Sequence, residues 1–95
     1  NDPTGYGKAI EEIDEYLTPI LEALKDDDML IITADHGCDP CVDGTDHTRE
    51  CVPVIMFGKN VKKENIGRRK TYADIAETIA QYFGLENLGV GKSFL

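Results

Sequence analysis

The sequence predicts an α/β fold in which helices flank a mostly parallel sheet. Three observations predict it: an amphipathic helical period near the start, two short and almost wholly apolar runs in the middle, and a second amphipathic period near the end. Helices that alternate with buried strands are typical of α/β proteins, whose strands are largely parallel. The chain has 95 residues, the length of one small domain. We therefore expect a single structural segment, residues 1–95.

The first helix is predicted from Tyr6 to Leu24. Its apolar residues recur at spacings of three and four, so they share one face, which we expect to be buried. Pro19 lacks an amide proton, so the helix either kinks there or restarts with Thr18 as its cap. Because the period runs through Pro19, a kinked or nearly continuous helix is favoured. The apolar face consists of Tyr6, Ala9, Ile10, Ile13, Leu17, Ile20, Leu21 and Leu24.

Two apolar runs predict strands that are buried on both faces. The first is "MLIIT" at residues 29–33, and the second is "VPVIMF" at residues 52–57, which ends at Gly58. Runs rich in β-branched residues are typical of the interior of a sheet. Pro53 places the start of the second run at a sheet edge. The polar and basic residues 59–70 that follow predict a solvated loop.

The second helix is predicted to begin after Thr71, a good N-cap residue. Asp74 lies three positions later, as in a variant of the capping box. Gly84 is a natural C-cap. The predicted inward stripe consists of Tyr72, Ile75, Ala76, Ile79, Tyr82 and Phe83.

The composition disfavours several classes of partner. The net charge is −8, from 18 acidic and 10 basic residues, and such a chain repels the phosphate backbone of nucleic acids. No apolar run approaches the roughly 20 residues that cross a bilayer, so we expect no membrane role. Three cysteines without an apolar leader indicate a reducing cytoplasm. The opening "NDPTGYG" has no initiator Met, and we expect a piece of a longer chain.

Metal-binding residue types gather in "ITADHGCDPCVDGTDHTREC", residues 32–51. Asp35 and His36 follow the first predicted strand directly, and a turn of the backbone at Gly37 would let both reach one ion. His47 comes eleven residues after His36, across a loop long enough to bring it back. One carboxylate and two imidazoles suit zinc or manganese. The alternative is an ordinary polar turn, in which Asp accepts backbone hydrogen bonds.

The cysteines of this loop leave further alternatives open. Cys38 and Cys41 form a CxxC, and Cys51 lies ten residues on. With a histidine they could hold a structural zinc ion, the CxxC could be a redox pair, or the three could be reduced thiols near a loop. A redox CxxC usually opens a helix, which "CDPCVDG" with its Pro and Gly does not. Arg49 could clamp a phosphate or pair with a nearby acid.

Several motifs together resemble the C-terminal part of the phosphopentomutases, a family of the alkaline phosphatase superfamily. These are "IITADHGCDP", "TDHTRE", "VPVIMFG", "RRKTYADIAETIAQYFG" and the closing "GKSFL". The resemblance covers essentially the whole chain. It implies an α/β sandwich with two divalent metal ions, usually manganese, at the carboxyl ends of the strands.

The resemblance also implies a reaction and a set of ligands. The family interconverts ribose 1-phosphate and ribose 5-phosphate, and the deoxyribose pair, through a phosphorylated threonine. Asp35 and His36 match ligands of one metal, and His47 matches a ligand of the other. The threonine nucleophile, the remaining ligands and the sugar-recognising cap domain match nothing here and are expected upstream, in the remainder of the same chain. We therefore expect part of a metal-binding core that is inactive alone.

Two alternatives to this interpretation remain. The cofactor-independent phosphoglycerate mutases also carry a "TADHG" strand end and a later histidine, although the tail "RKTYADIAETIAQYFG" with "GKSF" favours the pentose enzyme. The other is a non-catalytic zinc module built on Cys38, Cys41, Cys51 and a histidine.

Overall fold

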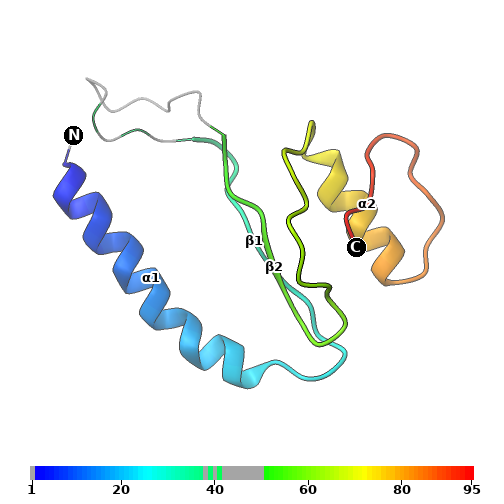
Figure 1. The fold of residues 1–95 in the computed structure, drawn as a ribbon, viewed down its shortest axis with the longest axis horizontal. Helices are drawn as coiled ribbons and strands as arrows, with labels where there is room; N and C mark the ends of the chain where they lie inside the picture. Colours follow the sequence, from blue (N-terminus) through cyan, green and yellow to red (C-terminus); the bar gives the residue numbers. More distant parts are fainter. Residues whose placement is uncertain (1, 38, 40, 42–50) are drawn as a thin grey trace. The chain divides into compact units, whose positions relative to one another are not determined.

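The structure is a computed structural model that describes residues 2–37, 39, 41 and 51–95. Its elements follow the order α1 (Pro3–Ala23), β1 (Leu30–Ile32), β2 (Ile55–Phe57) and α2 (Ala73–Tyr82) (Figure 1). The chain divides into two compact units, Asn1–Asn60 and Val61–Leu95. Neither helix is both long and apolar enough to span a bilayer. With two helices and a two-stranded sheet in its described residues, the chain is a small α/β protein.

Helix α1 is a single helix of 21 residues that passes through Pro19. The Asp2 carboxylate accepts a hydrogen bond from the Gly5 amide at 3.0 Å, and Pro3 stands in the first turn, where its missing amide has no helical partner to lose. The predicted continuous helix is confirmed, and a restart at Thr18 does not occur.

The apolar face of α1 is not buried, contrary to prediction. No residue of the helix is buried. Six of its large apolar residues are 39–69% exposed, and Leu17 is half-buried. Among the described elements of this unit, β1 and β2 contact each other and α1 packs on neither. Two strands of three residues offer too little apolar surface to cover such a helix. The exposed side chains are Tyr6, Ile10, Ile13, Tyr16, Ile20 and Leu21.

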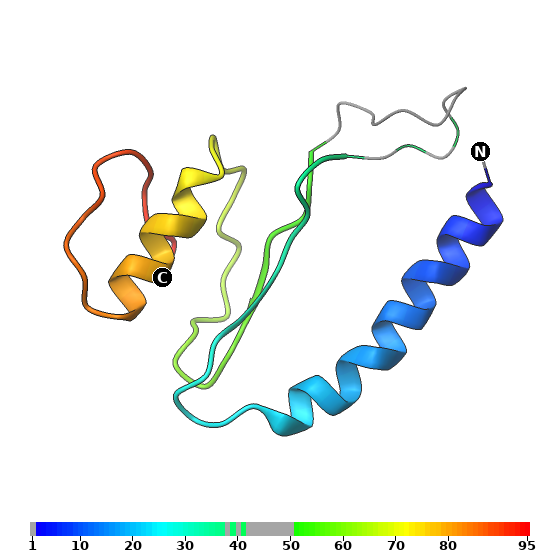
Figure 2. The same ribbon diagram turned by 180° about the vertical axis from the view of Figure 1, so that it is seen from behind.

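Strands β1 and β2 pair antiparallel, with Leu30 opposite Phe57 and Ile32 opposite Ile55. The expectation of parallel strands is wrong for this pair. A parallel crossover needs a dozen or more residues and usually a helix, and the described residues of the connection contain none. The antiparallel pairing has a consequence for the site: the end of β1 and the start of β2 lie at the same end of the ribbon (Figures 1 and 2).

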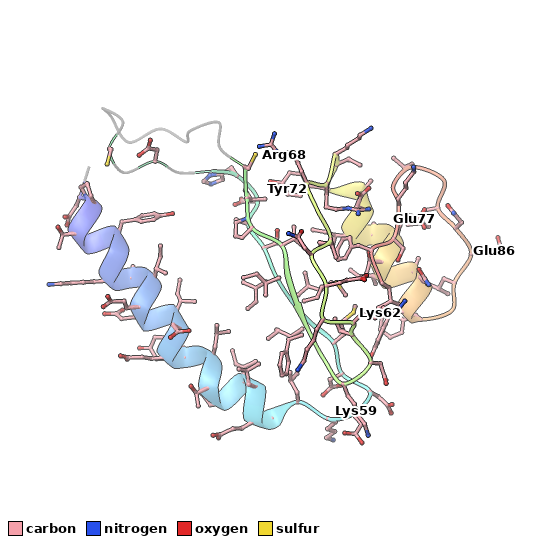
Figure 3. The ribbon with its side chains drawn as sticks, in the orientation of Figure 1. Lys59, Lys62, Arg68, Tyr72, Glu77 and Glu86 are labelled. Atoms are coloured by element: carbon pink, nitrogen blue, oxygen red, sulfur yellow. The ribbon has the colours of Figure 1, made fainter. Side chains whose placement is uncertain are left out.

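The opposite end of this ribbon is tied to the turn before β1. Lys59 forms an ion pair with Asp26 at 2.9 Å (Figure 3), and the Asn60 side-chain amide donates to the Asp26 carbonyl at 3.4 Å. Both charged side chains are exposed, so the pair adds little stability.

Helix α2 buries its polar face, whereas the sequence predicted burial of its apolar stripe. The buried residues are Asp74, Glu77, Thr78 and Ala80, while Phe83 is 71% exposed and Ile79 42%. The reason lies in the C-terminal segment, which returns along α2 on the polar side (Figures 1 and 2). That segment hydrogen-bonds the polar side chains. No residue of the predicted apolar stripe is buried: Ile75 and Tyr82 are half-buried and the others are exposed.

The C-terminal end of α2 follows its predicted capping residue, but the N-terminal end does not. The N-cap residue is Tyr72, one position after the predicted Thr71, and it makes no side-chain capping hydrogen bond. The Thr71 hydroxyl accepts a hydrogen bond from the Ala73 amide at 3.2 Å. Asp74 does not complete a capping box, because its carboxylate is bonded to Arg69 and Lys92 instead. At the other end Gly84 has φ +69°, and its amide donates to the Gln81 carbonyl while the next amide donates to that of Ala80. This is a Schellman motif, as the glycine predicted.

Candidate metal centre

The two adjacent metal-ligand candidates stand at the end of β1. The strand ends at Ile32, and the backbone bends at Asp35 and His36. In an extended strand, neighbouring side chains point to opposite faces. The bend instead brings Asp35 Oδ1 within 3.5 Å of His36 Nε2. The predicted turn of the backbone is therefore present, and it places both ligand atoms together.

The separation of these two atoms suits a shared divalent ion. Ligand atoms about 2.1 Å from a metal and 90–110° apart lie roughly 3.0–3.5 Å from each other. The observed 3.5 Å matches the upper end of that range. A carboxylate oxygen and an imidazole nitrogen are common ligands of zinc and manganese. The pair thus fits two neighbouring positions of one coordination shell.

A second contact orients the His36 ring. Its Nδ1 lies 2.9 Å from the Gly37 carbonyl oxygen. Because a carbonyl can only accept, this contact is a hydrogen bond in the tautomer whose proton is on Nδ1, and in that tautomer the lone pair is on Nε2. Metal-binding histidines are commonly oriented in this way by a carbonyl or carboxylate at the other nitrogen. The nitrogen near Asp35 is therefore the one suited to bind a metal.

The described residues supply only part of a metal shell. A structural zinc site has four protein ligands and a catalytic site usually three, and no group of three histidine, cysteine or acidic side chains gathers within the described part of the chain. The Asp35 side chain is 89% exposed and the His36 side chain is 39% exposed, so both are accessible to solvent. His47, the third predicted ligand, lies outside the described residues, as do Cys38 and Arg49.

Two of the three cysteines of the zinc-module alternative are described. Cys41 and Cys51 are both exposed and form no disulfide. The amide of Cys41 donates to the Asp39 carboxylate at 2.8 Å, an ordinary turn contact that does not involve the sulfur.

The loop predicted at residues 59–70 contains one residue that the sequence reasoning missed. Arg69 is not a solvated loop residue: it binds Asp74 at 2.9 Å, and its side chain is only 24% exposed. The sequence offered no signal for this ion pair, because Arg69 and Asp74 lie five residues apart, outside the three- and four-residue spacings of a helix face.

Comparison with known proteins assigns the family. The family described as "Metalloenzyme superfamily" matches residues 1–87. The chain belongs to the metalloenzyme superfamily. It is 55% identical over 94 residues to the phosphopentomutase of Hahella chejuensis. The identity is 52% to that of Vibrio cholerae serotype O1 (strain El Tor Inaba N16961) and 53% to that of Aeromonas salmonicida, each again over 94 residues.

These matches cover 99% of this chain and 23% of each relative. The chain thus spans less than a quarter of the length of these curated relatives. The resemblance to phosphopentomutases is confirmed, and membership of a metalloenzyme superfamily agrees with the ligand chemistry of Asp35 and His36.

Proposed function

We propose that this chain forms the C-terminal part of the metal-binding core of a cytoplasmic phosphopentomutase. The complete enzyme would interconvert ribose 1-phosphate and ribose 5-phosphate, and the deoxyribose pair. The observation that carries the proposal is the Asp35–His36 pair, 3.5 Å apart at the end of β1, in a chain 55% identical to a phosphopentomutase.

In this proposal the chain supplies ligands to two divalent metal ions, and manganese is the proposed metal for both. Asp35 and His36 hold one ion and His47 the other. Bound metals of this kind neutralise phosphoryl oxygens and align attacking and leaving groups. The Gly37 carbonyl keeps the His36 ring oriented. No residue of this chain acts as the nucleophile, which is a threonine elsewhere in the complete enzyme.

The uncovered apolar faces support a structural partner in the remainder of the enzyme. Six large apolar side chains of α1 are exposed, and so are Ile55 and Phe57 of β2 and Phe83 at the end of α2. Soluble monomers rarely leave apolar surface of this extent open. We propose that further strands of a mostly parallel sheet extend from β1 and β2 in the complete enzyme and cover these faces, so the isolated chain is inactive.

The decisive experiment is made on the complete enzyme, with residues numbered as in this chain. Asp35→Ala, His36→Ala and His47→Ala should each lower manganese-dependent turnover of ribose 1-phosphate by more than about 100-fold. Bound manganese, measured by elemental analysis, should fall in parallel. Cys51→Ser is the matched control from the same loop and should retain both turnover and metal. Full activity of the Asp35 and His36 variants would refute the proposed ligand roles.

The same preparations separate the alternatives. A phosphoglycerate mutase would turn over 3-phosphoglycerate and not ribose 1-phosphate. A zinc module would bind zinc tightly as the 95-residue chain, lose its circular dichroism on chelation, and suffer as much from Cys51→Ser as from His47→Ala. Robust mutase turnover by the 95-residue chain itself would contradict the proposed division of the site.

A further inference from the structure

The C-terminal segment Gly89–Leu95 lies on the polar face of α2. This face is formed by Asp74, Glu77 and Thr78, which are 5%, 4% and 0% exposed. Buried polar groups are costly unless each is hydrogen-bonded. The partners of these three side chains come largely from the returning segment, which makes the contact between them the core of residues 61–95.

Thr78 is at the centre of this contact. Its hydroxyl donates to the Asp74 carbonyl one turn earlier, at 2.7 Å, and accepts from the Phe94 amide at 3.0 Å. One hydroxyl therefore joins the helix backbone to the C-terminal segment. Valine has nearly the same shape and can do neither.

Asp74 and Arg69 together hold the backbone of Lys92. The Lys92 amide donates to Asp74 Oδ1 at 2.9 Å, and the Lys92 carbonyl accepts from Arg69 Nη2 at 3.1 Å. Arg69 Nε in turn donates to Asp74 Oδ2 at 2.9 Å. Both contacts use the Lys92 backbone, and Lys92 itself is exposed. These hydrogen bonds therefore depend on the backbone conformation at this position and not on the lysine side chain.

Three other positions of the segment do require particular residues. The Gly89 amide donates to Glu77 Oε1 at 2.8 Å (Glu77 is labelled in Figure 3), with φ +83°, which favours glycine. A Cβ on Gly91 would overlap the backbone of Ala73 and Asp74. Phe94 is 8% exposed, and its ring centre lies 5.4 Å from the Arg69 guanidinium carbon. Val90, by contrast, is 78% exposed.

We propose that Gly89–Leu95 is a C-terminal clasp that recognises the polar face of α2 through the pattern Gly-x-Gly-x-x-Phe and holds this helix folded. Isolated helices shorter than about 12–15 residues are marginal in water, and α2 has 10 residues. Its N-cap residue Tyr72 makes no side-chain capping hydrogen bond, and the Schellman motif at Gly84 satisfies only its last carbonyls. The clasp provides its buried contacts, so the clasp and α2 open together.

Amide hydrogen exchange of the 95-residue chain, followed by NMR, tests the proposal. Thr78→Val leaves the buried Phe94 amide without an acceptor, a loss that corresponds to about 10- to 100-fold faster exchange. The increase should appear together at the Lys92 and Phe94 amides and at the hydrogen-bonded amides of α2. Amides in the middle of α1 serve as the internal reference and should not change.

Three further variants separate the clasp from a general effect of substitution. Thr78→Ser keeps the hydroxyl and should largely restore the exchange rates. Gly91→Ala should accelerate exchange as Thr78→Val does, whereas Val90→Ala, in the same segment but exposed, should not. Faster exchange confined to the clasp, with α2 unchanged, would overturn the proposal, and so would equal effects of Gly91→Ala and Val90→Ala. The readout does not depend on enzyme activity.

Discussion

Truncation of Phe94 gives the sharpest test of where the core of residues 61–95 lies. An aromatic side chain buries about 150–250 Å². With about 150 Å² for Phe94, which is 8% exposed, and about 25 cal/mol per Å², the transfer term is about 4 kcal/mol. This is an upper bound, because the unfolded chain already buries roughly 10–40% of such surface. We therefore expect Phe94→Ala to lower the free energy of unfolding of this unit by about 2–3 kcal/mol.

Phe83→Ala is the matched control, since it makes the same chemical change in the same unit. Phe83 is 71% exposed, so its truncation should cost less than about 1 kcal/mol. Its ring lies in a T-shaped arrangement with that of Tyr82, with centroids 5.6 Å apart. The two side chains differ in burial and hardly in chemistry, so the difference between the variants measures burial.

Urea unfolding of the 95-residue chain, followed through the NMR signals of α2, provides the measurement. These signals report on the unit that contains both phenylalanines, so unfolding elsewhere in the chain does not enter the comparison. Equal losses for the two variants, or a larger loss for Phe83→Ala, would show that the apolar stripe of α2 and not its polar face is covered. The assignment of Phe94 to the core would then be wrong.

Three other predictions concern glycine, acid and the face of α1. Gly7 lies within α1, and a Cβ there would meet no other atom. Gly7→Ala should therefore raise helix stability by about 0.5–1 kcal/mol and increase the helical circular dichroism. Gly91→Ala should instead destabilise residues 61–95 by at least about 1 kcal/mol, and stabilisation by both variants would contradict the overlap at Gly91. The Lys92 amide, and secondarily Arg69, lower the pKa of Asp74 below its ordinary 3.8 against the opposing effect of burial. Its stabilising contribution is therefore complete above pH 3.8 and is lost as the pH falls through the lower folded-state value; Asp74→Asn should remove this part of the acid dependence of unfolding. Ile13→Glu, at a side chain 55% exposed, should reduce self-association of the 95-residue chain in sedimentation experiments, and a wild-type chain that stays monomeric at high concentration would contradict this.

Local features were predicted well from the sequence. The three- and four-residue period located α1, and the positive-φ requirement at the end of α2 identified Gly84 as its cap. Both depend on contacts within a few residues along the chain, which a sequence displays directly. The strand ends were also placed to within two or three residues.

The candidate metal pair was predicted from the sequence as to its residues, whereas its geometry comes from the structure. Two metal-ligand residue types after a buried strand predicted Asp35 and His36 from the sequence alone. Their ligand atoms lie 3.5 Å apart, and the His36 ring contacts the Gly37 carbonyl. Both features depend on the bend after β1. Residue identity does not determine this geometry.

The sequence by itself determined the helices, the apolar runs and the chemistry of the loop, because periodicity, capping and residue type act over short distances. Only the tertiary structure decided that β1 and β2 run antiparallel, and that α2 buries Asp74 and Thr78 while Ile79 and Phe83 of the predicted apolar stripe stay exposed. Both outcomes depend on residues far apart in the chain. An amphipathic pattern states which side chains gain from burial, but a helix face is buried only where another segment can satisfy it, and here Gly89–Leu95 does so by hydrogen bonds.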